Sequence, residues 1–168
     1  MKNTFLTPIA LGAALLLSTP AFAQDAPAPE PGAPGSMEWH NAQQAALHTL
    51  DAADGWFRLP RGIMFRRTAG DGTGPAPVVS DEITIHYTGT FVNGEVFDSS
   101  VERGEPATFP LSRLIEGWQV AIPYMGVGDT AEIVIPATAA YGLGGGRMPG
   151  GATLQFTIEL LGIPSKGV

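Results

Sequence analysis

Hydrophobic and polar residues alternate along two stretches of the chain, 82–88 and 153–161. Their apolar positions are Ile83, Ile85 and Tyr87 in the first stretch and Leu154, Phe156, Ile158 and Leu160 in the second. Successive side chains of a β-strand point to opposite faces, so this period of two predicts strands with one buried face. Shorter strands are expected to begin at 63–65 and to cover 130–135, which Pro136 closes.

Turn-forming residues separate these strands. Asn93-Gly94 lies between the short stretches 91–92 and 95–97, and this dipeptide favours a two-residue hairpin turn in which both positions have a positive φ. Residues 69–75 (AGDGTGP) space their glycines somewhat like a phosphate-binding loop but lack its Gly-Lys-Ser/Thr ending. We therefore interpret 69–75 as a turn.

Two segments have helical character. In 112–122, apolar residues recur at helical spacing, and Pro123 limits any continuation. The other segment, 37–54, contains no glycine or proline, and Ser36 before it and Gly55 after it are a suitable N-cap and stop. Its apolar residues are few: Met37, Leu47, Leu50 and alanines between them. A lone helix of this length is marginal in water, so we expect it to dock on the domain or to pair with a second copy.

The N-terminus has the pattern of an export signal. Lys2 precedes a short apolar run at 9–17, and Ala21-Phe22-Ala23 resembles a cleavage site. The alternative is a single membrane anchor, although the run is short for a membrane crossing. Residues 24–35 (QDAPAPEPGAPG) then predict an extended, semi-rigid tether. We expect export to a bacterial periplasm or out of the cell.

Together these patterns predict four parts: a signal peptide at 1–23, the tether at 24–35, a helical extension at 36–55 and one domain at 56–164. The domain is expected to be α+β, with an antiparallel sheet and a single short helix against its apolar face. The 22 glycines and 15 prolines among 168 residues agree with short strands joined by many turns.

Charge and composition exclude several functions. The net charge of −7 argues against nucleic-acid binding, which needs clustered lysine and arginine. The absence of cysteine excludes disulfides, thiolate chemistry and cysteine-based metal sites. His40 and His48 are expected to be surface residues, and His86 lies on the polar face of its strand. No nucleophile motif is present, so hydrolase, metal and cofactor chemistry are not expected.

Aromatic residues occur at turns and strand ends: Tyr87, Phe97, Phe109, Trp118, Tyr141 and Phe156. They could converge on one aromatic cavity, which is typical of a binding site. They could also form the ordinary core of a small sheet. Composition alone favours this second interpretation, because aromatic side chains contribute much of the area buried in cores.

Five ordered motifs resemble the FKBP-type peptidyl-prolyl cis-trans isomerases. They are His86-Tyr87-Thr88-Gly89, Phe97-Asp98-Ser99-Ser100, Ile115-Glu116-Gly117-Trp118, Ala140-Tyr141-Gly142 and Ala152-Thr153-Leu154-Gln155-Phe156. Residues 59–63 and 106–109 are similar to the secreted bacterial branch that includes the macrophage infectivity potentiators. The resemblance covers about 59–163 and implies a half-barrel antiparallel sheet wrapped around the short helix.

The resemblance also implies a pocket for a proline ring. Trp118 is similar to the pocket floor, and the walls correspond to Tyr87, Phe97, Phe109, Leu114, Ile115 and Phe156. Tyr141 matches the family tyrosine whose hydroxyl binds a substrate carbonyl. Ile115 is similar to the family position whose backbone N–H holds a second substrate carbonyl. Asp98 resembles the carboxylate at the pocket edge, although an aspartate before Ser99-Ser100 also suits a turn.

The implied activity is isomerisation of X–Pro bonds in exported proteins, with proline-containing polypeptides as substrates and the family's macrolides as inhibitors. A homodimer through 36–54 is a further hypothesis, since infectivity potentiators have an N-terminal dimerisation segment. Two departures favour a second hypothesis, a binding or chaperone module with little turnover. Ala107 stands where many members have an aromatic wall, and the glycine-rich loop 142–151 replaces bulky apolar residues.

Overall fold

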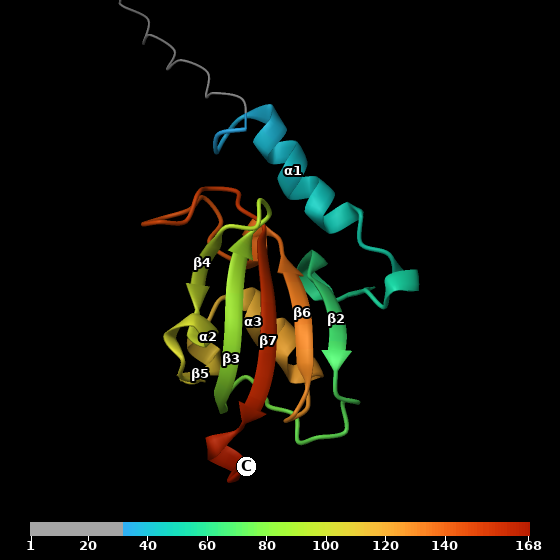
Figure 1. Cartoon of the computed structure of the whole chain (residues 1–168), viewed down its shortest axis with the longest axis vertical. Coiled ribbons are helices and arrows are strands. Elements are labelled where there is room, and N and C mark those ends of the chain that lie inside the picture. The colour runs from blue at the N-terminus through green and yellow to red at the C-terminus, as the bar shows by residue number, and fades with distance from the viewer. Residues whose placement is uncertain (1–31) are drawn as a thin grey trace, which may run out of the picture.

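The computed structural model describes residues 32–168, so the predicted signal peptide and most of the tether lie outside the described residues. All strand pairs are antiparallel, and the strands follow the order β1-β2-β6-β7-β3-β4, with β5 also paired to β3 (Figure 1). The strands are β1 (Phe57–Arg58), β2 (Met64–Ala69), β3 (Glu82–Phe91), β4 (Val96–Ser99), β5 (Ala107–Pro110), β6 (Thr130–Ile135) and β7 (Leu154–Gly162). Within 32–168, none of the helices combines the length and apolar character needed to cross a membrane.

In the described part of the chain, three α-helices accompany the sheet: α1 (Met37–His48), α2 (Ser100–Arg103) and α3 (Glu116–Ala121). Short 3-10 turns lie at Ala52–Asp54, Pro60–Gly62, Leu111–Arg113, Ile122–Tyr124, Ala137–Ala139 and Pro164–Lys166. Figure 1 shows α3 behind β3, β7 and β6, and α1 beyond one end of these strands. The predicted α+β class, with an antiparallel sheet against a short helix, is confirmed.

The core lies between the sheet and α3. Every apolar position of the two alternating stretches is buried, as the period of two predicted. From α3 and the turn after it, Trp118, Ala121 and Ile122 join the same cluster. The inner face of the sheet is therefore closed by one short helix.

Both predicted helices are shorter than expected. Instead of running to residue 54, α1 ends at His48, because Asp51 is extended and its side chain caps the separate turn Ala52–Asp54. In 112–122, only Glu116–Ala121 is α-helical, since Ile115 takes extended backbone angles and Pro123 lies in a 3-10 turn. The Ser36 N-cap is confirmed, because its Oγ accepts from the N–H of Trp39 at 3.1 Å.

The hairpin between β3 and β4 also differs from the prediction. Only Gly94 has a positive φ, and Asn93 does not. The N–H of Gly94 donates to the carbonyl of Phe91, and the N–H of Phe91 donates to the carbonyl of Glu95. The connection is thus longer than a two-residue turn, and β3 continues three residues past the predicted end.

The N-terminal helix docks on its own domain, one of the two outcomes expected for it. Leu47 of α1 is buried in a small cluster with Trp56, Met64 and Val134, and Leu50 lies against this cluster. Met37, the other expected apolar residue, is exposed. Leu47 is therefore covered within one chain, whereas Met37 is not.

Candidate functional site

One cavity of about 270 Å³ opens on the inner side of the sheet. Its lining contains all nine residues predicted as site residues, together with Arg113: Tyr87, Phe97, Asp98, Phe109, Leu114, Ile115, Trp118, Tyr141 and Phe156. These residues come from β3, β4, β5, α3, β7 and the segments between them. Both interpretations of the aromatic residues hold in part, because Tyr87, Trp118 and Phe156 also belong to the buried core.

Trp118 lies at the base of this cavity. Its ring meets Tyr87 edge-on, with ring centroids 5.3 Å apart, and meets Phe156 edge-on at 5.0 Å. Such edge-to-face packing is favourable because ring edges are positive and ring faces negative. The indole Nε1 is buried and has no hydrogen-bond partner within the described chain. The floor is therefore aromatic, and its one polar atom is the unpartnered indole nitrogen.

The wall beside Trp118 depends on a glycine of β3. A Cβ at Gly89 would lie 2.6 Å from Cζ of Phe97 and 2.8 Å from Cε1 of Phe156. Both distances are below van der Waals contact, so the two rings rest directly on the backbone of Gly89. The ring of Phe156 packs edge-on against that of Phe97, with centroids 5.7 Å apart. The glycine of the His-Tyr-Thr-Gly motif thus makes room for two cavity walls.

The opposite wall is formed by extended backbone. Leu114 and Ile115 lie between the turn Leu111–Arg113 and α3, and both have extended angles. The carbonyl of Ile115 accepts the N–H of Trp118 at 3.0 Å and so starts the helix. In the described part of the chain, the N–H of Ile115 has no acceptor.

Asp98 lies at the edge of the cavity in a network of three side chains. Its carboxylate accepts the hydroxyl of Tyr87 at 2.6 Å and forms an ion pair with Arg103. Arg103 also donates to the Tyr87 hydroxyl at 3.0 Å, and its guanidinium lies 5.6 Å from the centre of the Tyr87 ring. The short helix α2, capped by the Ser99 hydroxyl, turns Arg103 back toward Asp98.

This network shifts the ionisation of its members. Partial burial alone would raise the pKa of Asp98, but hydrogen bonds from Tyr87 and Arg103, with the charge of Arg103, hold it below its ordinary value. Burial and the hydrogen bond to Asp98 raise the pKa of Tyr87. At neutral pH the cavity edge therefore carries an ionised carboxylate next to a neutral phenol.

Replacing Arg103 should change this balance. We expect Arg103→Gln to raise the pKa of Asp98, because the substitution removes a charge-assisted hydrogen bond and a nearby positive charge. An NMR titration of the side-chain carboxyl carbons measures the shift. Arg61→Gln is the matched control, since Arg61 pairs with Glu116 rather than with Asp98. An unchanged Asp98 titration in Arg103→Gln would show that the ion pair does not hold the pKa down.

Tyr141 reaches the cavity from the start of the glycine-rich loop. Its side chain is half exposed, and its hydroxyl has no partner in the described part of the chain. None of the residues 142–151 lines the cavity, and Leu143 is fully exposed. Ala107 does not line it either and packs against the core instead. The cavity is thus open on the side of this loop.

Sequence reasoning missed three residues of this site. Arg103 completes the Asp98 network, and Arg113 lines the cavity. Ser100 is buried, and its Oγ accepts the N–H of Tyr87 at 2.8 Å and lies 3.1 Å from Nδ1 of His86. One sequence feature could have indicated the Asp98–Arg103 pair: an acidic and a basic residue lie on either side of Ser99, a suitable helix N-cap. Ser100 belongs to one of the family motifs, but the sequence gives no sign of its contacts, because its partners His86 and Tyr87 lie on β3.

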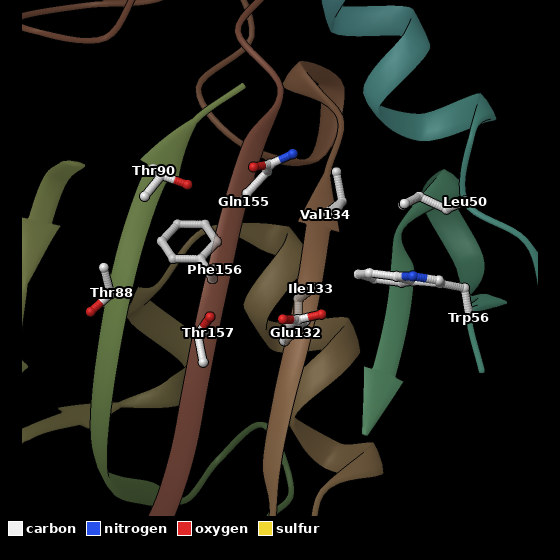
Figure 2. A pocket seen from close by; sticks show the side chains of 10 residues that line it. All are labelled: Leu50, Trp56, Thr88, Thr90, Glu132, Ile133, Val134, Gln155, Phe156 and Thr157. Carbon is white, nitrogen blue, oxygen red and sulfur yellow. The ribbon is translucent and has the colours of Figure 1, made fainter. Parts of the chain in front are cut away.

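A second cavity, of about 210 Å³, lies on the outer face of the sheet (Figure 2). Figure 2 shows the outward side chains of β3, β7 and β6 facing Leu50 and Trp56. Half of its lining residues are polar: Thr88, Thr90, Gln155, Thr157 and Glu132. The other half are apolar: Leu50, Trp56, Ile133, Val134 and Phe156. Glu132 is paired with Arg66, whose guanidinium covers the Trp56 ring at 4.8 Å. Within 32–168, no group of three or more acidic or histidine side chains is arranged for a metal ion.

Comparisons with known proteins agree with this geometry. The model of the FKBP-type peptidyl-prolyl cis-trans isomerase family matches residues 74–161, more than half of the chain. The chain is 48% identical over 93 residues to the FKBP-type peptidyl-prolyl cis-trans isomerase FkpA of Aeromonas hydrophila, covering 55% of this chain and 35% of that protein. It is 42% identical over 112 residues to the macrophage infectivity potentiator of Trypanosoma cruzi, covering 66% and 57%.

A solved structure shows the same fold. The peptidyl-prolyl cis-trans isomerase of Pseudomonas syringae superposes with a TM-score of 0.63 at 32% identity, covering 73% of this chain and 93% of that one. The chain spans between about a third and three-fifths of the two curated relatives named above. The similarity to infectivity potentiators expected from the sequence is confirmed. The chain belongs to the FKBP-type peptidyl-prolyl cis-trans isomerase family.

Proposed function

We propose that this chain catalyses cis-trans isomerisation of X–Pro bonds without covalent chemistry. One observation carries the proposal: an apolar, aromatic cavity of about 270 Å³ has a free tyrosine hydroxyl and an ionised carboxylate at its edge. A proline ring is apolar and fits a dry aromatic floor, while its neighbouring carbonyls need donors. Tyr141 and the N–H of Ile115 supply donors without partners in the described chain.

The energetics of the reaction suit such a site. Rotation about a peptide bond faces a barrier of roughly 18–20 kcal/mol, which amide resonance sets. Twisting the bond removes that resonance and makes the carbonyl less polar. The twisted form therefore loses less hydration free energy when it leaves water. A dry cavity that binds the twisted amide better than either planar form lowers the barrier. Each 1.36 kcal/mol of this difference gives about tenfold in rate.

Asp98 would act through its field rather than as an acid or a base. Its pKa lies below the ordinary value, so at neutral pH it stays ionised, has no proton to give and is a weak acceptor of one. The ion pair with Arg103 and the hydroxyl of Tyr87 fix its position. We propose that the carboxylate orients this network and favours the altered charge distribution of the twisted amide.

Tyr141→Phe tests the proposed carbonyl contact. The variant should lower kcat/KM about three- to tenfold, the range that one ordinary hydrogen bond supplies. Its stability should not change, because the Tyr141 side chain is half exposed and its hydroxyl has no partner in the described chain. Tyr124→Phe is the matched control, since Tyr124 is 48% exposed, Tyr141 is 49% exposed, and Tyr124 does not line the cavity. Equal activity in both variants would remove Tyr141 from the mechanism.

The proposed activity itself is tested on a short X–Pro peptide. The chain from residue 24 onward should accelerate cis-to-trans conversion over the spontaneous rate, with several residues tested before proline. An FKBP-directed macrolide should inhibit the reaction. This expectation comes from a relative in Kluyveromyces lactis that is named FK506-binding protein 1 and of which the match covers 90%. A rate equal to the uncatalysed one would contradict the proposal.

A second candidate function is a chaperone or peptide-binding module with little turnover. The open side of the cavity favours it, because residues 142–151 add nothing to the lining. In that case the chain would suppress aggregation of an unfolded protein while leaving X–Pro conversion near its spontaneous rate. Tyr141→Ala would then keep this suppression, whereas an isomerase that uses Tyr141 would lose activity.

We further propose export of the chain after cleavage behind Ala23, to the periplasm or beyond the cell. The signal pattern at 1–23 supports this, and a relative from Legionella longbeachae is named outer membrane protein MIP. A mass measurement on the exported protein should give a chain beginning at Gln24. A homodimer through 36–54 remains a prediction, and light scattering on the same chain measures its mass.

A further inference from the structure

The N-terminal helix contacts the segment that carries Tyr141. Trp39 of α1 packs against Gly151, whose φ is +80°, and a Cβ there would lie 3.3 Å from Cζ3 of the Trp39 ring. Only a glycine combines this backbone angle with so close an approach. Trp39 also packs on the core cluster to which Ala152 belongs. The helix therefore rests on the C-terminal end of the loop 142–151.

A buried glutamine fixes the next residues. Gln43 is 3% exposed, and its Oε1 accepts the N–H of Thr153 at 2.8 Å. The Thr153 hydroxyl, also buried, donates to the backbone carbonyl of Gln43 at 3.2 Å. Leaving a buried backbone N–H without an acceptor is unfavourable, so this pair holds α1 and the start of β7 in one arrangement.

The two ends of the loop are tied together. The N–H of Gly151 donates to the carbonyl of Gly142 at 2.8 Å, and Gly142 directly follows Tyr141. The N–H of Gly142 donates to Ala137 at 2.8 Å, and that of Gly144 donates to Tyr141 at 2.8 Å. Trp39 therefore touches Gly151, Gly151 is hydrogen-bonded to Gly142, and Gly142 is joined to Tyr141 by a peptide bond.

The rest of the loop has little support from α1. A cavity of about 450 Å³ separates the first turns of the helix from Arg147 and Pro149, with Trp39 and Gln43 in its wall. Leu143 is fully exposed. The loop also has a backbone bridge of its own, in which the N–H groups of Gly145 and Met148 each donate to the other residue's carbonyl. The contact that α1 adds lies at the loop base, where Trp39 meets Gly151.

We propose that Trp39 and Gln43 are positioning residues for the proline pocket, acting on Tyr141 through the loop base. This inference rests on the proposed isomerase function. The lower half of α1 provides a contrast, because Leu47 packs with Trp56, Met64 and Val134 and does not contact the loop. A helix that only stabilised the domain would act equally through both halves.

The first test needs no catalysis. Amide hydrogen exchange should be faster at residues 142 and 151–153 in Trp39→Ala and Gln43→Ala than in the unmodified chain. Trp39→Phe should largely restore slow exchange, because it keeps an aromatic ring over Gly151. Gln44→Ala, at the exposed neighbour of Gln43, and Leu47→Ala should leave exchange at these residues unchanged, even though Leu47→Ala lowers the melting temperature. Unchanged exchange in the first two variants would overturn the proposal.

The second test measures the isomerase reaction. Trp39→Ala and Gln43→Ala should lower kcat/KM about three- to tenfold through KM, because the Tyr141 hydrogen bond is shared by the bound substrate and the twisted form. A matching loss in Leu47→Ala would overturn the proposal in favour of general stabilisation. If the unmodified chain does not accelerate the reaction, the proposed function fails, and the exchange result still decides whether α1 positions the loop.

Discussion

Gly89→Ala is expected to lower kcat/KM for an X–Pro peptide by one to two orders of magnitude. A methyl group at this position would lie 2.6 Å from Phe97 and 2.8 Å from Phe156, so both rings must move. Phe156 packs against Trp118, and Phe97 is paired with Phe91 at 4.9 Å, so the space left for the rings to shift into is the cavity that they line. Displacing groups around a reacting bond by about 1 Å can cost roughly 100-fold in rate.

The matched control is Gly145→Ala. Gly145 has an ordinary φ, and a Cβ there would meet no atom within 4 Å. This variant adds the same methyl group where there is room, so its activity should equal that of the unmodified chain. Far-ultraviolet circular dichroism checks that Gly89→Ala keeps its sheet. A folded Gly89→Ala chain with full activity would show that the two aromatic walls do not shape the reactive cavity.

The sequence predicted most of the sheet and the membership of the cavity. The inner faces of β3 and β7 follow from strict alternation, because a strand that slipped by one residue would turn every apolar side chain to solvent. The nine predicted site residues came from the family resemblance rather than from periodicity. Their convergence could not be derived from spacing, since Tyr87 and Phe156 lie on paired strands far apart in the chain.

The missed features depend on polar contacts between distant segments. The hydrophobic pattern of α1 indicated that Leu47 would be buried. The contact of α1 with Thr153, directly before β7, is instead made by Gln43, a polar residue that the hydrophobic pattern does not mark. The early end of α1 depends on Asp51, whose side chain bonds to the backbone locally and competes with the helix. Arg103 pairs with Asp98 only because a four-residue helix returns the chain. Such pairs are specified by tertiary geometry.

Asp129→Asn should produce the largest loss of stability. The Asp129 side chain is 3% exposed, and its carboxylate accepts the N–H of Gly126 at 2.8 Å, the N–H of Gly72 at 3.1 Å and Nε of Arg67 at 2.9 Å. An amide can accept at only one end, so its NH₂ group would face a donor. Breaking a buried pair of this kind costs about 3 kcal/mol, near the lower end of its range because Arg67 is partly exposed.

The same carboxylate predicts how this loss depends on pH. Burial alone would raise the pKa of Asp129, but the two backbone N–H groups and Arg67 lower it below the ordinary 3.8. A carboxyl with a depressed folded pKa stabilises the fold above its unfolded pKa, and that stability is lost as pH falls through the folded pKa. Urea unfolding measures the free energy of unfolding of the unmodified chain and of Asp129→Asn. The difference between these two free energies should therefore have its full value at pH 7 and be smaller below pH 3.8. Asp71→Asn is the control and should stay close to the unmodified chain, since Asp71 lies exposed in the loop 70–74 that Asp129 contacts through Gly72. A difference that stays constant down to low pH would mean that the ionised carboxylate is not what holds β2, the loop 70–74 and the start of β6 together.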